Sequence, residues 1–407
     1  MPATDVAKDL LGEAGGFVEA CRPTDLIYFT LNVGDGDTQL LLLPENSKGQ
    51  RRAIVVDCIR ATKLFALIDT LVDAELLKQV EPLLALVVAT HPHDDHIAGM
   101  AALLRRFGRT GPDQPNHIGE FWEPAYYHPS RSYLEMMREL EDLDISHLQP
   151  ASGTTRYMGL VKLTVLAPGI ELRNKFDSYG VNINDASIAL KVEFPAKRTI
   201  ERAKDRTYIK LPTSQALILG ADAQTRSWAQ VMVDFPQLDP AKTAVTKALR
   251  RARGYEPLNA SVFKVPHHGS KHGLNLELVE LMKPGMSIVS SVRGGGRYEF
   301  PHALTQMALR EALDPISSKP GSEYKSDPAL SILYTGSREL DEKGRPGGTL
   351  GTIAVLVGAG GRREVWRFGD GATGKVDLDE GRPMFAGAVA AAREPVPAIP
   401  RARRRGG

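Results

Sequence analysis

Residues 86–99, which read LVVATHPHDDHIAG, constrain the fold more than any other stretch of the sequence. An apolar run typical of a short buried β-strand ends in three histidines and two aspartates within six residues. His91, His93, Asp95 and His96 carry imidazole and carboxylate groups, which are ligands for zinc, manganese and iron. Clustered ligands at a strand end have few structural uses. The stretch therefore predicts a metal site at the carboxyl end of a strand, where open α/β sheets place their sites.

The spacing within this cluster indicates two metal ions. His91 and His93 can converge on one ion, while Asp95 and His96 turn toward a second. Ions about 4 Å apart can hold a hydroxide between them. The sequence thus predicts a dinuclear site.

Three other apolar segments also end in ligand-type residues: AIVVD at Asp57, LILGAD at Asp222, and VFKVPHH at His267 and His268. Taken alone, Asp57 and Asp222 are equally consistent with strand-end caps. Four segments of this kind together predict that ligands gather along one edge of a β-sandwich. A carboxylate has two oxygens and can bridge two cations, and Asp222 is our candidate for that bridge. Which of His267 and His268 binds metal stays open at this point.

Strand-like and helix-like segments alternate in two runs, residues 25–107 and 161–310. This alternation predicts an α/β fold in which two sheets form a sandwich with helices outside, an αββα arrangement. The Gly-, Pro- and Ser-rich residues 314–350 are predicted to be irregular. We divide the chain into an N-terminal arm, a single domain with insertions and a flexible tail: residues 1–23, 24–370 and 371–407. The tail is rich in Gly, Ala, Pro and Arg and has few large apolar residues to bury.

The composition is that of an ordinary soluble protein, with 42% hydrophobic and 25% charged residues. A net charge of +2 is too small to indicate a nucleic-acid partner by itself. With only two cysteines, Cys21 and Cys58, a disulfide framework is excluded and a reducing compartment fits. The N-terminus has no apolar signal region, and no run approaches the roughly 18 apolar residues that cross a bilayer. We therefore expect a cytoplasmic protein without a membrane anchor.

The H-x-H-x-D-H motif, followed by a strand-terminal aspartate and a strand-terminal histidine, resembles the metallo-β-lactamase fold superfamily. In finer detail the chain is similar to the metallohydrolase domain of ComEC and its free-standing relatives. The matching segments are FTLNVGDGDTQLLLL, IVVDC, THPHDDHIAG, NDASIAL, LILGAD, VFKVPHHGS, SIVSSVRGGGRYEFPH and GTIAVLV. They cover most of the chain between residues 26 and 357. No counterpart of the membrane region of ComEC is present among them.

The resemblance implies two divalent metal ions, zinc or manganese. It implies that the ligands are His91, His93, Asp95, His96, Asp222 and one or both of His267 and His268. Asp57 would orient the metal-binding loop, and we take Asp57 and Asp95 as the candidate catalytic residues. The glycine-containing hairpin at residues 34–37 would pack near the site.

The chain departs from the superfamily at the turn that precedes one of its strands. Many members carry a histidine there, whereas residues 184–187 read Asn-Asp-Ala-Ser. ComEC-like domains share an Asn-rich turn at this place. The first metal would then lack one ligand, and Asp185 is a candidate weak oxygen ligand. ComEC-like sequences also often carry Asp at the position of His93, and residues 300–302 read Phe-Pro-His where relatives tend toward Gly-His-Pro.

A dinuclear site supplies hydroxide at neutral pH and neutralises charge on an anionic substrate. This chemistry suits a phosphodiester, and the ComEC resemblance implies DNA or a nucleotide-like ester. Ser270, Lys271, Arg297 and His302 are candidate substrate-binding residues, although a solvated turn explains them equally well. The basic segment at residues 242–253 and the Arg-rich end of the chain modestly favour nucleic acid over a small nucleotide.

Two other functions remain open. The same fold supports hydrolysis of carboxylic esters, lactones or thioesters, which needs no basic elements. A non-catalytic domain that binds nucleic acid or a partner is the third hypothesis, although the sequence indicates no protein partner. Retention of all the predicted ligands argues against a domain that has lost its activity.

Overall fold

The computed structural model describes residues 11–78, 81–108, 116–143, 145–173, 182–196, 199–203, 206–210, 215–234, 258, 260–282, 284–293, 300–313, 332–337 and 350–384. Several predicted features lie outside these residues: residues 1–10 of the N-terminal arm, the basic segment 242–253, the candidate substrate-binding residue Arg297, most of the segment 314–350, and the tail beyond residue 384. Every other side chain predicted to belong to the site is described.

The first sheet contains nine strands among the described residues, in the order β18-β17-β16-β1-β2-β3-β4-β5-β6. These strands are β1 (Leu26–Thr30), β2 (Thr38–Leu42), β3 (Ala53–Cys58), β4 (Leu84–Val88), β5 (Glu120–Trp122), β6 (Ser146–Leu148), β16 (Ile353–Val357), β17 (Arg363–Arg367) and β18 (Arg382–Met384). β1, β2 and β3 are antiparallel, and β3 to β6 are parallel. The first three strands are buried along their whole length, which explains their nearly continuous apolar sequences.

The second sheet contains seven of the described strands, in the order β15-β14-β13-β12-β9-β8-β7. These strands are β7 (Thr155–Met158), β8 (Val161–Ala167), β9 (Ala189–Phe194), β12 (Gln215–Leu219), β13 (Val262–Lys264), β14 (Ser287–Arg293) and β15 (Ile332–Ser337). β12 to β15 are parallel, while β9 pairs antiparallel with both β8 and β12. A separate hairpin consists of β10 (Thr199–Ala203) and β11 (Arg206–Lys210).

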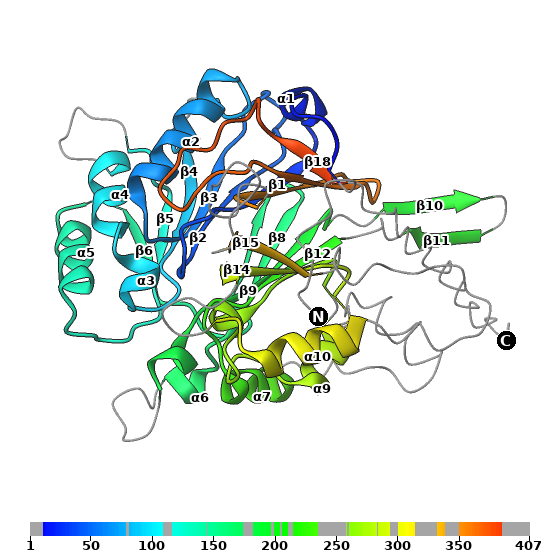
Figure 1. Ribbon diagram of the computed structural model, residues 1–407. Coiled ribbons are helices and arrows are strands. Elements are labelled where there is room, and N and C mark those ends of the chain that lie inside the picture. The colour runs from blue at the N-terminus through cyan, green and yellow to red at the C-terminus, as the bar shows by residue number, and fades with distance from the viewer. Residues whose placement is uncertain are drawn as a thin grey trace, which may run out of the picture.

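Helices cover the outer faces of both sheets (Figure 1). The helices are α1 (Phe17–Ala20), α2 (Ala61–Asp73), α3 (Asp94–Ile97), α4 (Met100–Phe107), α5 (Arg131–Glu141), α6 (Ile170–Arg173), α7 (Thr225–Asp234), α9 (Leu276–Met282) and α10 (Ala303–Leu313), with 3-10 turns η2 (Ile183–Ala186) and η4 (Pro266–Gly269). The sequence of α4 shows why it packs as it does. Met100, Leu103, Leu104 and Phe107 recur at helical spacing and are all buried on one face.

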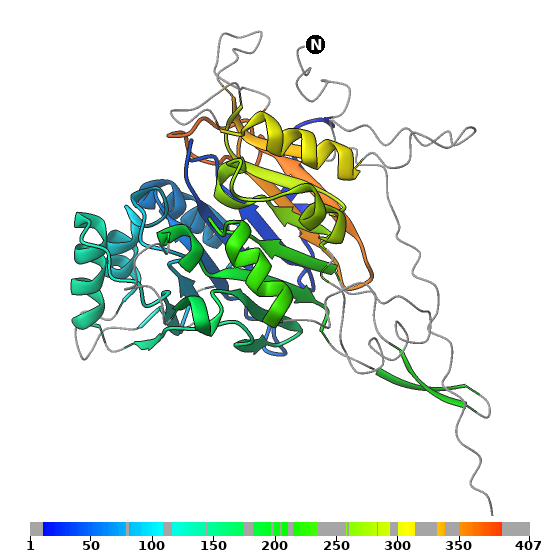
Figure 2. The ribbon, with the colours of Figure 1, turned by 90° about the horizontal axis from the view of Figure 1, so that it is seen from below.

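Three apolar cores separate the layers. One core lies between the first sheet and helices α2, α4 and α5. A second joins the two sheets face to face, with residues such as Val56 and Leu86 from the first sheet and Leu217 and Val262 from the second. The third lies between the second sheet and helices α7, α9 and α10, which cross its outer face in Figure 2. The predicted αββα arrangement is therefore confirmed.

The topology brings the predicted ligand segments to one edge of the sandwich. β3 and β4 are parallel neighbours in the first sheet, and β12 and β13 are parallel neighbours in the second. The carboxyl ends of parallel neighbours lie at the same edge of their sheet. Asp57 is at the end of β3, and His91, Asp222 and His267 follow β4, β12 and β13.

The C-terminal part differs from the sequence-based expectation. Residues 332–337 form β15 rather than irregular chain, because Ile332 and Leu333 are buried at the edge of the second sheet. Residues 371–384 belong to the folded part of the chain and not to the predicted flexible tail, because Val376 is buried in the first core and β18 pairs with β17.

The N-terminal arm also contributes to the core in its described part. Phe17 is fully buried in α1 and makes edge-on ring contacts with Phe29, Trp366 and Phe368. Such contacts add to the stabilisation by apolar burial. No helix in the described ranges is both long and apolar enough to span a bilayer.

Candidate metal centre

The loop after β4 and the short helix α3 position four predicted ligands. His93 immediately precedes α3, so Asp95 and His96 lie in the first turn of that helix. Gly99 follows α3, and its N–H donates to the Cys58 carbonyl at 2.7 Å. A Cβ atom on Gly99 would lie 2.9 Å from this same carbonyl oxygen, so only glycine lets the loop approach β3 so closely.

The predicted ligands converge around the carboxylate of Asp222, which follows β12. Two groups of ligand atoms each lie within 4.8 Å of one another: His91, His93 and Asp222 in one, and Asp95, His96, Asp222 and His268 in the other. Asp222 is common to both groups. The structure therefore brings together the first ligand pair and the second ligand pair on two sides of the predicted bridge.

The donor set fits divalent cations. Both oxygens of Asp222 and the Nε2 atoms of His96 and His268 are buried and have no hydrogen-bond partner among the described residues outside this cluster. Buried polar atoms are rarely left without partners, because desolvating them without compensation costs about 1–3 kcal/mol each. These four atoms all face the same cluster and all belong to metal-ligand side chains. Imidazole and carboxylate donors of this kind suit zinc or manganese.

The electrostatics of the cluster also favour cations. Burial opposes ionisation of Asp222, but the imidazoles of His96, His268 and His267 lower the pKa of its carboxyl well below the usual value. Burial likewise disfavours the charged form of His96, yet the Asp222 and Asp57 carboxylates raise its pKa well above the usual value. The carboxylates thus attract positive charge into the position where a cation would lie.

Asp57 is a positioning residue in this structure. It is fully buried and has a positive φ of 59°, which a non-glycine residue rarely adopts. Thr90 donates its N–H and its hydroxyl to the two Asp57 oxygens, each at 2.8 Å, and His96 Nδ1 lies 2.7 Å from Asp57 Oδ2. This contact turns His96 Nε2 toward Asp222. These contacts fit the orienting role that the resemblance implies for Asp57, and its catalytic role stays a prediction.

Asp95 lies on the open side of the cluster. Its side chain is 36% exposed, whereas those of His96 and Asp222 are 0% and 1% exposed. His93 and His267 are partly exposed as well. Among the described residues, the exposed side of the cluster is therefore formed by Asp95, His93 and His267. Asp95 stays a candidate both as a ligand and as a catalytic residue.

A buried ion pair behind the site was not predicted from the sequence. Asp37, from the hairpin between β1 and β2, pairs with Lys264 of β13, and both side chains are fully buried. Asp37 Oδ1 lies 3.9 Å from His268 Nδ1, and Asp37 Oδ2 lies 4.0 Å from His96 Nδ1. The pair links the two sheets directly behind two predicted ligands. The hairpin indeed packs at the site, since the Asp37 N–H donates to the Asp95 carbonyl at 3.0 Å.

His267 and the remaining predicted residues lie around the cluster without joining either group of ligand atoms. Asp185 accepts a hydrogen bond from the Ser227 hydroxyl at 3.1 Å, so its carboxylate is already engaged. Ser270 is buried, and its hydroxyl accepts from the His272 N–H at 3.3 Å. The exposed Lys271 follows it directly.

His302 caps a helix in this structure. Its Nδ1 atom accepts from the Leu304 N–H at 3.2 Å, at the first turn of α10. Its own N–H donates to the Gly269 carbonyl at 2.8 Å, which ties α10 to the turn that carries His267 and His268. Phe300, two residues before His302, makes ring contacts with both His267 and His268.

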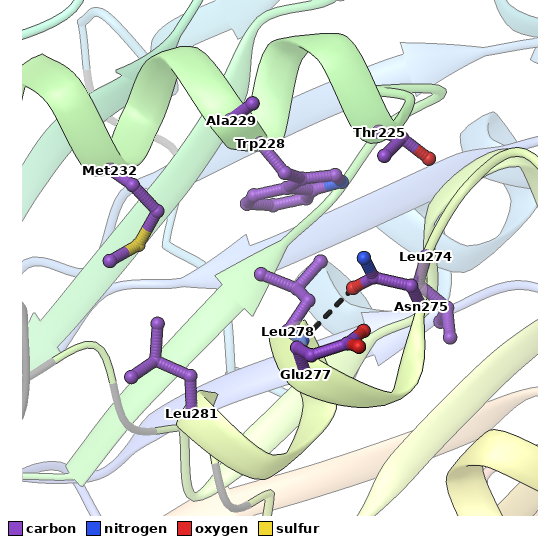
Figure 3. Close-up of a pocket in the computed structure, with 9 residues that line it drawn as sticks. All are labelled: Thr225, Trp228, Ala229, Met232, Leu274, Asn275, Glu277, Leu278 and Leu281. Carbon is purple, nitrogen blue, oxygen red and sulfur yellow. Dashed lines mark hydrogen bonds between the residues drawn. The ribbon is translucent and has the colours of Figure 1, made fainter.

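A separate cleft of about 340 Å³ lies between α7 and α9 (Figure 3). Its lining is mostly apolar and includes Trp228, Met232 and Leu278. Trp228 Nε1 donates to the carbonyls of Ala223 and Gly273, at 3.2 and 3.1 Å. The indole thus connects the segment after Asp222 to the loop that follows the two histidines. None of the clustered ligands lines this cleft.

Comparison with known proteins gives similarity of fold alone. No family profile matches this sequence, and no curated protein matches it. The metallo-β-lactamase fold protein YhfI from Bacillus subtilis is 12% identical, with a TM-score of 0.37, and the match covers 71% of this chain and 94% of that one. A mutant of the β-hydroxylase CmlA is 12% identical, with a TM-score of 0.34, and the match covers 72% of this chain and 51% of that one.

A long form of RNase Z from yeast is 11% identical, with a TM-score of 0.31, and the match covers 66% of this chain and 37% of that one. The chain therefore spans about half of the CmlA chain and little more than a third of the RNase Z chain. Because all these similarities are distant, the assignment of the fold rests on the sheet order and the three cores described above.

Proposed function

We propose that this protein is a metal-dependent hydrolase that cleaves phosphodiesters, with DNA as the candidate substrate, and that it holds two divalent ions, zinc or manganese. One observation carries the proposal: two groups of ligand-type atoms share the Asp222 carboxylate, and both of its oxygens and the Nε2 atoms of His96 and His268 are buried without a hydrogen-bond partner in the described ranges outside the cluster. A purely structural cluster would satisfy these atoms with hydrogen bonds. A structural metal site is also typically closed, whereas Asp95 leaves this one open on one side.

Two bound cations would supply an activated hydroxide at neutral pH and would neutralise charge on an anionic substrate. The residues of this chain hold and orient the ligands. Asp57 fixes the ring of His96, and the Ser290 carbonyl accepts from His268 Nδ1 at 2.8 Å. These contacts leave both Nε2 atoms facing Asp222. Preorganised ligands need little rearrangement during the reaction.

The substrate class follows from chemistry and from sequence resemblance. Two adjacent cations favour an ester that carries negative charge, as a phosphodiester does. The VGxGD hairpin and the KVPHHGS segment of ComEC-like domains correspond to the sequence around Asp37 and Lys264, which meet behind the site. The exposed Lys271 beside the open face is a candidate contact for a phosphate group. Both cysteines are unpaired, which fits a reducing compartment such as the cytoplasm.

A substrate panel tests this proposal. The purified protein is incubated with zinc or manganese and with single-stranded DNA, plasmid DNA, bis-nitrophenyl phosphate, a lactone and a thioester. We expect turnover of the phosphodiesters that a chelator abolishes. His91→Ala is expected to lower this turnover by at least about 100-fold, because one ion loses a ligand. His147→Ala is the matched control, since His147 lies on β6 and contacts Glu123 at 3.3 Å.

Three outcomes would contradict the proposal. Metal-dependent turnover of the lactone or the thioester alone would favour the second enzymatic function. Protein that binds no metal and hydrolyses none of the substrates would favour a binding domain. Phosphodiesterase activity that survives in His91→Ala would show that the activity arises elsewhere or from a contaminant.

A further inference from the structure

We infer that the adjacent residues His267 and His268 serve different metal ions: His267 completes the first site and His268 completes the second. The inference rests on the proposed dinuclear hydrolase and deepens it, because it gives the first ion a third imidazole. The sequence had left two questions open, namely which of these histidines binds metal and what replaces the ligand absent from residues 184–187.

The two oxygens of Asp222 separate the surrounding imidazoles into two pairs. Asp222 Oδ1 lies 3.1 Å from His96 Nε2 and 3.6 Å from His268 Nε2. Asp222 Oδ2 lies 3.6 Å from His91 Nε2 and 3.6 Å from His267 Nε2. A carboxylate can bridge two cations with one oxygen on each, and the separation of the rings fits this mode. The side on which each ring lies therefore assigns His267 to the ion held by His91, and His268 to the ion held by His96.

The backbone of η4 explains how neighbouring residues reach opposite sides of one carboxylate. His267 and His268 have φ values of 49° and 51°, in the left-handed region that non-glycine residues rarely adopt. Two such residues in succession cost about 1–3 kcal/mol each, and such strain is concentrated at functional sites. The His267 N–H donates to the Ala221 carbonyl at 2.8 Å, so the turn is fixed to the strand end that carries Asp222.

Each ring is also held from behind by a different partner. His268 Nδ1 lies 2.8 Å from the Ser290 carbonyl, and its Nε2 lies 3.5 Å from Asp95 of the second group. The side-chain nitrogen of Gln224 lies 3.2 Å from His267 Nδ1, and the amide oxygen would have to take its place for Nε2 to bind metal, because Nδ1 then carries the proton and donates. Ligand histidines are typically oriented by a contact at the ring nitrogen that does not bind metal. Both rings therefore present Nε2 to the Asp222 carboxylate.

The turn at residues 184–187 places a side-chain amide beside His267. The Asn184 side-chain nitrogen lies 3.4 Å from His267 Nε2, and its Oδ1 atom is buried without a hydrogen-bond partner. Asp185, the other candidate from this turn, is bonded to Ser227. Thus His267, rather than Asp185, supplies the ligand that the first site was expected to lack.

Metal stoichiometry in single and double variants tests the assignment. Glycine is the substitute at both positions, because it removes the imidazole and adopts positive φ without strain. Metal content is measured by mass spectrometry after dialysis against zinc or manganese, with circular dichroism as the check of folding. The wild type is expected to bind about two ions per chain, and His267→Gly and His268→Gly about one each. The exposed His272, in the same loop, is the matched control as His272→Ala.

The double variants distinguish the two sites. His91→Ala combined with His267→Gly removes two ligands of one ion, so about one ion is expected to remain. His91→Ala combined with His268→Gly removes a ligand from each ion, so binding of both is expected to be lost. The reverse pattern, or a wild type that binds fewer than two ions, would overturn the assignment. Correct stoichiometry without turnover of any phosphodiester would contradict the proposed function and leave this assignment intact.

Discussion

Replacing Asp222 with Asn is expected to lower phosphodiester turnover by at least about 10³-fold and to reduce the bound metal to one ion or none. Asp222 is 1% exposed, and neither oxygen has a hydrogen-bond partner in the described part of the chain outside the ligand cluster. An amide offers one oxygen in place of two and carries no charge. Metal ions contribute several kcal/mol of transition-state stabilisation, and each 1.4 kcal/mol corresponds to a factor of ten in rate. Steady-state kinetics and metal analysis measure the two effects.

Asp69→Asn is the matched control for this variant, because Asp69 is an exposed carboxylate paired with Arg106. It should bind metal and turn over substrate as the wild type does. Retention of two ions and of more than about a tenth of the activity in Asp222→Asn would show that this carboxylate is not the bridge.

Replacing Lys264 with Met is expected to lower the free energy of unfolding of the metal-free protein by about 3–5 kcal/mol. The substitution leaves the Asp37 carboxylate buried with no ammonium partner. Asp37 would then interact more strongly with His96 and His268, which lie 4.0 and 3.9 Å away, and would disturb their orientation. Urea denaturation measures the stability, and titration with zinc measures metal affinity, which should also fall.

A second buried ion pair provides the control, because it shows the effect of losing a buried lysine at another position. Lys63 pairs with Asp370, both 2% exposed, and Lys63 also donates to the carbonyls of Asn32 and Gly371. Lys63→Met should destabilise the protein to a similar extent but leave zinc affinity unchanged. The double variant Asp37→Asn/Lys264→Met should recover part of the stability, because no uncompensated charge remains. A Lys264→Met protein as stable as the wild type would contradict this account.

Much of the ligand cluster could be predicted because the candidate ligands follow apolar strands in the sequence. A strand end is a local signal, so His91, Asp222 and His268 could be found without knowing how the strands pair. The parallel pairs β3-β4 and β12-β13 then place these ends at shared edges. Which ion each of His267 and His268 serves could not be predicted, because it depends on two successive left-handed backbone conformations.

Contacts between segments far apart in the sequence could not be predicted either, because they depend on how the chain folds. Asp37 and Lys264 are separated by 227 positions, and only the packing of the two sheets brings them together. A lysine in an apolar strand gives no indication of its partner. The prediction of the fold failed in a similar way: β15 and the buried Val376 lie in segments whose Gly and Pro content predicted loops.

Anomalous diffraction from crystals grown with zinc or manganese tests the central claim most directly. The account predicts two peaks about 3.5–4 Å apart, one on each side of the Asp222 carboxylate. One peak should lie beside His91 and His267, and the other beside His96 and His268. A single peak, no peak in this cluster, or two peaks on one side of the carboxylate would contradict a dinuclear centre bridged by Asp222.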